Sequence, residues 1–499
     1  MKTKLFPPVL LWCAVIAAST LLICSKSSPL YPLNDWVDAN TYLTVGRGML
    51  RGKVPYRDLY EQKGPLLYML HAAAALISGK SFFGVFLIET AACTAFLYEA
   101  CLLMENSCGR YALWLMPVLS GAIYASDSFC HGDSAEELCL PLTLGAYLIG
   151  HGAVHGRRAL SGREWFILGV LGGAVLWIKF SFLGIFAAAA IAGIIAAVKN
   201  GRAGLLPGEI SFCVLGAAAA SLPVMLYFAA NGAVSELFSV YFYDNLFRYG
   251  GGSSVLLRNI GNGLYFCLLF MLIPAVLICA GTVLVPLREG KASAAYFLGS
   301  AALMILTAFG GHLSYQYYPL AMAVFVPQAL GTAAGTFLPE LSGKDFPRRA
   351  YAAICAAGTV LCAFWCLLTS RNVYLMKYDR DELPQYIFAD VIEENGGGSL
   401  LNYGFIDGGF YLAAGQVPEF RYFCLNNMAV PEMAAAQDWY ISSGRADFAV
   451  VRSLKPQPEV LLPGYSIIAE AEMCYYDKKF YYFLFKCNEI DKNIISAIE

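Results

Sequence analysis

Long apolar runs recur along the first three-quarters of the chain, and they constrain its fold more than any other feature. A helix needs roughly 20 apolar residues to cross the hydrocarbon core of a bilayer, and we expect about eleven such helices here. The predicted spans are 6–24, 82–104, 110–126, 137–153, 164–179, 181–198, 209–230, 260–286, 293–310, 316–337 and 349–369. The sequence therefore predicts an all-α polytopic membrane protein.

Composition supports this class and excludes others. The chain is 58% hydrophobic and 14% charged, whereas a soluble protein carries about 25% charged residues. The net charge is -2 and no basic stripe is present, so we do not expect nucleic-acid binding. The 16 Cys lie mostly inside apolar runs and show no Cys-x-x-Cys or Cys/His ligand spacing. We therefore expect no disulfide framework, no zinc site and no cofactor; a divalent metal is compatible with the sequence but nothing indicates one.

The distribution of basic residues predicts the topology. Five connections carry Arg or Lys, and they share one side of the membrane only if the apolar segment 64–78 does not cross. We therefore expect 64–78 to be a juxtamembrane or re-entrant helix. The first span, 6–24, is interpreted as an uncleaved signal anchor with a cytoplasmic N-terminus. An odd number of crossings then places the C-terminal residues outside the cytoplasm.

The composition changes after residue 370, where the long apolar runs end and Gly, Asp, Glu and Asn become more frequent. We expect a transmembrane domain over 1–370 and a small α/β extracytoplasmic domain over 371–499. Short apolar runs between turn residues are typical of strands. The predicted helix is Glu382–Glu394, and the predicted strands are Leu400–Tyr403, Phe448–Arg452, Tyr465–Ala471 and Lys479–Phe485.

Charged residues concentrate in the first predicted outer loop, within residues 34–68. A carboxylate in a partly dry pocket can act as a general base, and this loop offers Asp35, Asp38, Asp58 and Glu61. Lys63 and the nearby Arg57 are placed at the membrane surface, where a cation suits an anionic lipid head group. The alternative is that the acids are solvated loop residues and the cations simply contact lipid phosphates.

Further candidates lie in the other predicted outer segments. Glu136 and Glu137 open a predicted span, and they are candidate catalytic acids or residues that favour a helix N-terminus. His312 precedes Tyr315 and Tyr318, which we expect either to bind substrate or to form an interfacial aromatic belt. Residues 241–252 predict an amphipathic helix, on which Arg248 is a candidate phosphate ligand.

The first loop also resembles a known family. Its pattern is Asp38-x-x-x-Tyr42, then Gly46-Arg47, then Gly52-Lys53-Val54-Pro55-Tyr56-Arg57-Asp58, then Lys63-Gly64-Pro65. This is similar to bacterial membrane glycosyltransferases of the GT-C fold, akin to protein O-mannosyltransferases (glycosyltransferase family 39) and lipid A aminoarabinose transferases. Members often have Lys-Pro-Pro where this chain has Lys-Gly-Pro. The stretch 132–138, the His312 turn and the small C-terminal domain are also similar. The resemblance covers most of 1–370.

The resemblance implies an inverting transfer of a sugar from a polyprenyl-phosphate donor to a glycan, lipid or protein acceptor outside the cytoplasmic membrane. It carries the catalytic Asp onto Asp38, with Asp35 as a competing position, and the phosphate-binding Lys onto Lys63. Arg57, Asp58, Glu136 and Glu137 are supporting candidates. Two alternatives remain: a transporter or lipid flippase, and a non-catalytic envelope protein. A transporter usually has polar residues at mid-membrane and inverted repeats, which this sequence does not show.

Overall fold

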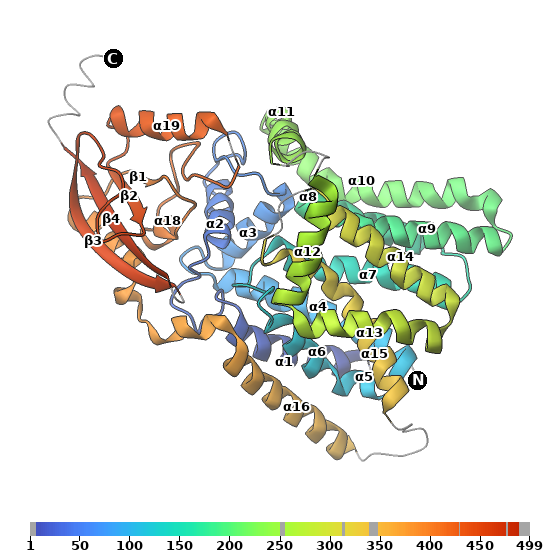
Figure 1. The fold of residues 1–499 in the computed structure, drawn as a ribbon. Coiled ribbons are helices and arrows are strands. Elements are labelled where there is room, and N and C mark those ends of the chain that lie inside the picture. The colour runs from blue at the N-terminus through green and yellow to red at the C-terminus, as the bar shows by residue number, and fades with distance from the viewer. Residues whose placement is uncertain are drawn as a thin grey trace. The chain divides into compact units, whose positions relative to one another are not determined.

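The structure is a computed structural model that describes residues 6–249, 255–311, 315–338, 348–428, 430–475 and 478–488. In these ranges eight helical segments are long and apolar enough to cross a membrane. They are Phe83–Cys108 (α4), Ala135–His155 (α7), Gly162–Phe182 (α8 and η1), Ala203–Ala230 (η2 and α10), Leu272–Glu289 (α13), Lys291–Phe309 (α14), Tyr318–Phe337 (η5 and α15) and Arg349–Thr369 (within α16). The predicted multi-pass membrane protein is confirmed (Figure 1).

Shorter apolar helices complete the membrane part. They are Phe6–Cys24 (α1), Pro65–Ile77 (α3), Tyr111–Trp114 (α5), Met116–Tyr124 (α6), Gly184–Lys199 (α9) and Leu256–Phe270 (α12). Helix α3 covers the segment expected not to cross. Its 13 residues rise about 20 Å, which is short of the roughly 30 Å hydrocarbon core.

Two predicted spans are interrupted, because 110–126 is divided at Leu115 into α5 and α6, and 260–286 is also broken. The apolar run 260–286 is not one helix but two, α12 and α13, which are separated at Met271. Pro274 explains the break, because its ring clashes with the carbonyl four residues earlier and its nitrogen cannot donate to it. That carbonyl, on Phe270, instead accepts the backbone N–H of Ser128 at 3.0 Å.

The chain divides into two compact units, which are described separately. The bundle unit comprises 1–25, 87–227 and 250–371, and the sheet unit comprises 26–86, 228–249 and 372–499. Residues 26–86 of the first outer loop and its flanks are therefore grouped with the C-terminal residues. The sequence-based prediction instead divides the chain into two domains at residue 370. The sheet unit gathers the segments that are poorest in long apolar runs.

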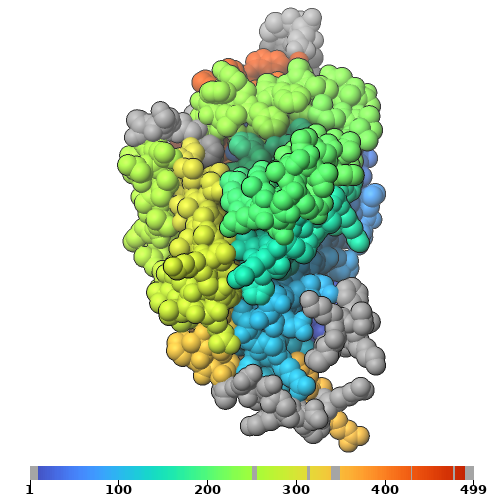
Figure 2. Space-filling model, turned by 90° about the vertical axis from the view of Figure 1, so that its right-hand side faces the viewer, coloured from blue at the N-terminus to red at the C-terminus, as the bar shows by residue number. Residues whose placement is uncertain are grey.

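In the bundle unit, helix α7 packs against α8, α9, α14 and η5, and α13 packs against α15. Figure 2 shows the teal-to-green segment α8–α10 beside the yellow segment that contains α14. Small residues let these helices approach closely. A Cβ on Gly169 of α8 would meet the Cys213 carbonyl oxygen of α10 at 1.9 Å, so only glycine fits at that crossing.

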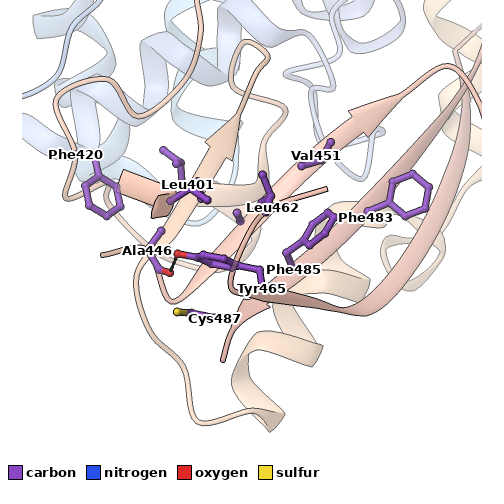
Figure 3. Close-up of a cluster of buried hydrophobic side chains, with 11 residues drawn as sticks. Leu401, Phe420, Ala446, Val451, Leu462, Tyr465, Phe483, Phe485 and Cys487 are labelled. Carbon is purple, nitrogen blue, oxygen red and sulfur yellow. Dashed lines mark hydrogen bonds between the residues drawn. The ribbon is translucent and has the colours of Figure 1, made fainter. Parts of the chain in front are cut away.

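The sheet unit contains a four-stranded sheet in the order β1-β2-β4-β3. Its strands are Leu400–Tyr403 (β1), Phe448–Ser453 (β2), Tyr465–Tyr475 (β3) and Lys478–Cys487 (β4). Strands β1 and β2 run parallel and the other pairs are antiparallel. All four predicted strands and the predicted helix, found as Pro384–Glu394 (α17), are confirmed. Figure 3 shows the buried cluster that supports the sheet, in which the Tyr465 hydroxyl donates to the Ala446 carbonyl at 2.5 Å.

The remaining helices of the sheet unit are Val37–Met49 (α2), Val234–Glu236 (α11), the π-helix Leu237–Arg248 (η3), Arg371–Lys377 (η6, which begins at the unit boundary), Arg380–Glu382 (η7), Phe410–Ala413 (α18) and Pro431–Ser442 (α19). Helix α2 is fixed on two sides. The Thr44 hydroxyl donates to Asp407 at 2.6 Å, and Arg47 donates to the Tyr411 carbonyl at 3.2 Å. Toward α3, a Cβ on Gly46 would lie 2.6 Å from the Ala72 nitrogen, which explains the glycine of the Gly46-Arg47 motif. These contacts hold rigidly the helix whose first turn carries Asp38.

Candidate active site

Asp38 and Lys63 face each other in the sheet unit. Asp38 lies in the first turn of α2, where the helix dipole favours an anion. Its Oδ2 is 3.5 Å from Lys63 Nζ and accepts the Tyr42 hydroxyl at 3.3 Å. The two side chains are 12% and 19% exposed, so each is shielded from bulk water yet accessible to a ligand. The structure thus brings together the predicted base and the predicted phosphate ligand.

The backbone around Lys63 is held by two tyrosines. The Tyr56 hydroxyl donates to the Lys63 carbonyl at 2.7 Å, and the Lys63 N–H donates to the Tyr68 hydroxyl at 3.0 Å. Tyr56 is fully buried, stacks on Phe228 at 5.5 Å between ring centroids, and has a φ of 70°. A left-handed backbone costs a non-glycine residue on the order of 1–3 kcal/mol and is typical of functional sites.

Glu61 is the second carboxyl beside Lys63. It is 3% exposed and accepts the Tyr68 hydroxyl at 3.4 Å. Burial raises the pKa of Glu61 to about 7; the positive charge of Lys63 opposes this rise and the negative charge of Asp38 adds to it. Glu61 therefore changes its charge near neutral pH next to the predicted phosphate ligand.

Asp35 occupies a closed environment. Its Oδ1 pairs with Lys26 Nζ at 2.5 Å, and its Oδ2 accepts the Tyr374 hydroxyl at 2.6 Å. The Lys26 and Asp35 side chains are 0% and 2% exposed. An acceptor hydroxyl would have to displace these partners to reach Asp35. The catalytic assignment of Asp35 stays a prediction, and the geometry supports it less well than that of Asp38.

Arg57 and Asp58 bind each other. Arg57 Nε lies 2.9 Å from Asp58 Oδ1 and Arg57 Nη1 donates to the Asn231 carbonyl at 2.8 Å, while Asp58 also accepts the Val54 N–H at 2.7 Å. The hydrogen bond from Arg57 is the largest cause of the lowered pKa of Asp58. This pair stabilises the turn between α2 and α3, and its predicted role in substrate binding is untested.

Arg248 is the last residue of η3. The helix predicted over 241–252 is therefore confirmed as far as Arg248, and it is a π-helix. Its Nε is 3.3 Å from Asp244 Oδ1, and the Tyr60 hydroxyl donates to Asp244 Oδ2 at 2.8 Å. The Arg248 side chain is 43% exposed. It therefore keeps guanidinium surface available for an anion.

In the bundle unit, Glu136 and Tyr318 both contact Lys179. Glu136 is buried and forms an ion pair with Lys179, whose Nζ lies 4.1 Å from the centroid of the Tyr318 ring. Tyr315 contacts Tyr318 edge-on at 5.6 Å between ring centroids. The tyrosines predicted at this turn thus form a cluster. His312 lies outside the described residues.

Glu137 joins two other buried acids. The Asp133 N–H donates to Glu137 at 2.9 Å and to Glu89 at 2.7 Å, and the Ser25 hydroxyl donates to Glu89 at 2.9 Å. All three acidic side chains are at most 1% exposed. The sequence analysis missed Glu89, although an ionisable residue inside the apolar run 82–104 is itself a signal of function.

One group among the described residues has the spacing to hold a metal ion. Ligand atoms of His151, His155 and Glu289 lie within 4.8 Å of one another. The carboxylate of Glu289 also accepts hydrogen bonds from Ser107 and Thr332. His151 is 15 positions after Glu136 on α7, which places the group roughly 20 Å from Glu136. That the reaction needs no metal stays a prediction.

No family model and no curated protein matches the sequence. The solved structures that match the fold include two of ArnT from Cupriavidus metallidurans. The apo structure has a TM-score of 0.61 at 13% identity and covers 95% of this chain and 97% of the other. The structure bound to undecaprenyl phosphate has a TM-score of 0.58 at 13% identity and covers 95% and 98%. The expected GT-C fold is confirmed: over nearly its whole length, this chain has the fold of ArnT.

Proposed function

We propose that this protein is an inverting membrane glycosyltransferase that takes a sugar from a polyprenyl-phosphate donor. The observation that carries the proposal is the Asp38–Lys63 pair, which presents a general base and a phosphate-binding cation 3.5 Å apart in a partly accessible site. The ArnT fold supports it, because that protein has been crystallised with undecaprenyl phosphate.

Lys63 stabilises the leaving group. Transfer breaks the bond between the anomeric carbon and a phosphate oxygen, and the electron pair of that bond stays on the phosphate. A fixed cation stabilises the charge that develops there, most effectively where water is largely excluded. Lys63 is 19% exposed and its backbone is held by Tyr56 and Tyr68, so little reorganisation accompanies the reaction.

Asp38 accepts the proton of the acceptor hydroxyl. As the acceptor oxygen bonds to the anomeric carbon, its proton passes to Asp38 Oδ, and a single displacement inverts that carbon. The Tyr42 hydroxyl holds the carboxylate from one turn further along α2. Arg57, Asp58, Arg248, His312, Tyr315 and Tyr318 are proposed substrate-binding residues, and Glu136 and Glu137 are proposed supporting acids.

The reaction is proposed to occur on the outer side of the cytoplasmic membrane. The basic connections between spans indicate the cytoplasmic side of the membrane. The Asp38 loop and residues 371–499 are then expected on the outer side. Cysteine labelling of intact cells at position 390, an exposed site on α17, tests this orientation. Labelling by a membrane-impermeant reagent supports it, and labelling only after lysis contradicts it.

The activity is tested with purified protein in nanodiscs and a polyprenyl-phosphate-linked radioactive sugar. We expect acceptor-dependent release of the free polyprenyl phosphate and a product of inverted anomeric configuration. Lys63→Gln is expected to weaken donor binding, whereas the exposed strand control Lys478→Gln is not. Movement of the intact donor between leaflets without release of phosphate would indicate the lipid flippase instead.

A further inference from the structure

Helices α7, α9 and α14 of the bundle unit surround a cavity of about 760 Å³. Its walls are built largely from small residues at facing helix positions, among them Ala188 and Ala192 on α9 and Ala292, Ala295 and Gly299 on α14. Small side chains leave space between helices that a larger residue would fill. The volume is typical of ligand sites.

One end of this cavity is cationic. Arg157 follows the last turn of α7, and Lys199 and Asn200 end α9, so all three lie where these helices leave the apolar region. Both charged residues that line the cavity are basic and exposed. Asn200 donates to the Arg157 carbonyl at 3.3 Å, which ties the two helix ends together.

This cationic end is distant from the acids at the start of α7. Helix α7 begins next to Glu136 and Glu137 and ends next to Arg157, and its 21 residues rise about 30 Å, the thickness of the hydrocarbon core. The cationic mouth therefore lies at the opposite membrane surface from these two acids.

We propose that this cavity binds an anionic glycerophospholipid, with its phosphate at Arg157 and Lys199 and one acyl chain between α9 and α14. Basic pockets between transmembrane helices are suited to anionic lipid head groups. From Ala292 to Leu303 the cavity wall extends about 16 Å, which is close to the depth of one leaflet. The inference requires only that the bundle lies in a membrane and does not depend on the proposed glycosyltransferase activity.

The head-group contact is tested by native mass spectrometry of the full chain with phosphatidylglycerol or phosphatidylcholine of identical chains. We expect preferential retention of phosphatidylglycerol. Each basic residue near an anionic head group contributes roughly a factor of five, so Arg157→Gln/Lys199→Gln should lower this retention by at least about tenfold. The charge-matched control Arg163→Gln/Arg349→Gln, on exposed residues outside the cavity, should leave it unchanged.

The acyl-chain contact is tested separately. A Cβ on Gly299 meets nothing within 4 Å, so Gly299→Leu can fill the cavity without a backbone clash and should abolish retention. Gly261→Leu, at an equally open glycine of α12, is the matched control. Equal retention of both lipids, retention unchanged in Gly299→Leu, or displacement by inorganic phosphate alone would overturn the proposal. Melting temperatures of all variants identify any loss that reflects unfolding.

Discussion

Lys26 and Asp35 form an ion pair of 2.5 Å in which neither side chain is more than 2% exposed. Asp35→Asn would leave the Lys26 ammonium buried beside a neutral amide. Breaking a buried pair from one side costs about 3–5 kcal/mol, and we expect a loss in this range in the free energy of unfolding. Chemical denaturation in detergent micelles measures it.

The matched control is Asp38→Asn, three positions along the chain. Asp38 is 12% exposed and lies 3.5 Å from its cation, so its substitution should cost less than that of Asp35. Lys26→Met/Asp35→Leu, which removes both buried charges, should be more stable than Asp35→Asn. Equal stability of Asp35→Asn and the wild type would contradict the structural role of the pair.

Glu61→Gln should change the pH dependence of stability. The pKa of Glu61 is about 7 in the folded protein against an ordinary value of 4.5, so the folded state binds this proton more tightly than the unfolded state. The contribution of Glu61 to the free energy of unfolding therefore falls by on the order of 3 kcal/mol as the pH rises from about 4.5 to 7. Above pH 7 this contribution no longer changes. Gln removes this contribution while keeping an acceptor for Tyr68.

Thermal unfolding at pH 5 and pH 8 checks this expectation. The stability of Glu61→Gln relative to the wild type should be greater at pH 8 than at pH 5. Asp390→Asn, at an exposed carboxyl of α17, should show no such difference. A constant offset between Glu61→Gln and the wild type at both pH values would be inconsistent with the raised pKa.

Thr44→Val should weaken the attachment of α2 to the segment that carries Asp407. The Thr44 hydroxyl donates to Asp407, a fully buried carboxyl whose pKa burial raises to about 6. Leaving a buried acceptor without this donor costs about 1–3 kcal/mol. Thr143→Val is the control, since the Thr143 hydroxyl donates to the Cys139 and Leu140 carbonyls of its own helix, α7. Both variants are compared by equilibrium unfolding, and a similar loss in each would argue against the attachment.

Gly132→Ala should destabilise the loop that positions the acids of the bundle unit. Gly132 has a φ of 83°, and a Cβ there would lie 2.3 Å from Ser25 Oγ and 2.7 Å from Glu89 Oε1. Gly109 also has a positive φ, 56°, but a Cβ there meets nothing within 4 Å. The difference in unfolding free energy between the two alanine variants should be about 1–3 kcal/mol, the cost of overpacking. Equal losses would mean that strain in the backbone alone decides both.

Local sequence patterns were sufficient to predict most of the membrane helices and the strands of the sheet. Apolar run length identifies a span, and a short apolar run between turn residues identifies a strand. The break within 260–286 was missed because hydropathy does not register that Pro274 removes a helical hydrogen bond. Pro274 was visible in the sequence and could have been used.

The candidate site was predicted in part. The motif placed Asp38 and Lys63 in one short loop, and the structure brings them together. The hydrogen bond from Tyr374 to Asp35 was not predictable from local patterns, because Tyr374 lies 339 positions away. Nor could the acidic cluster be predicted, since it depends on the strained Asp133 backbone meeting a carboxyl of α4.

The role of Asp38 is tested most directly by measuring sugar transfer and donor binding together in Asp38→Asn. A general base contributes typically 10²–10⁴-fold to the rate, so transfer should fall by at least about 10²-fold. Binding of polyprenyl phosphate should be retained, because Lys63 is unchanged, and Asp390→Asn should behave as the wild type. Transfer by Asp38→Asn at the wild-type rate would contradict the account and would direct the search for the base to Asp35 or Glu136.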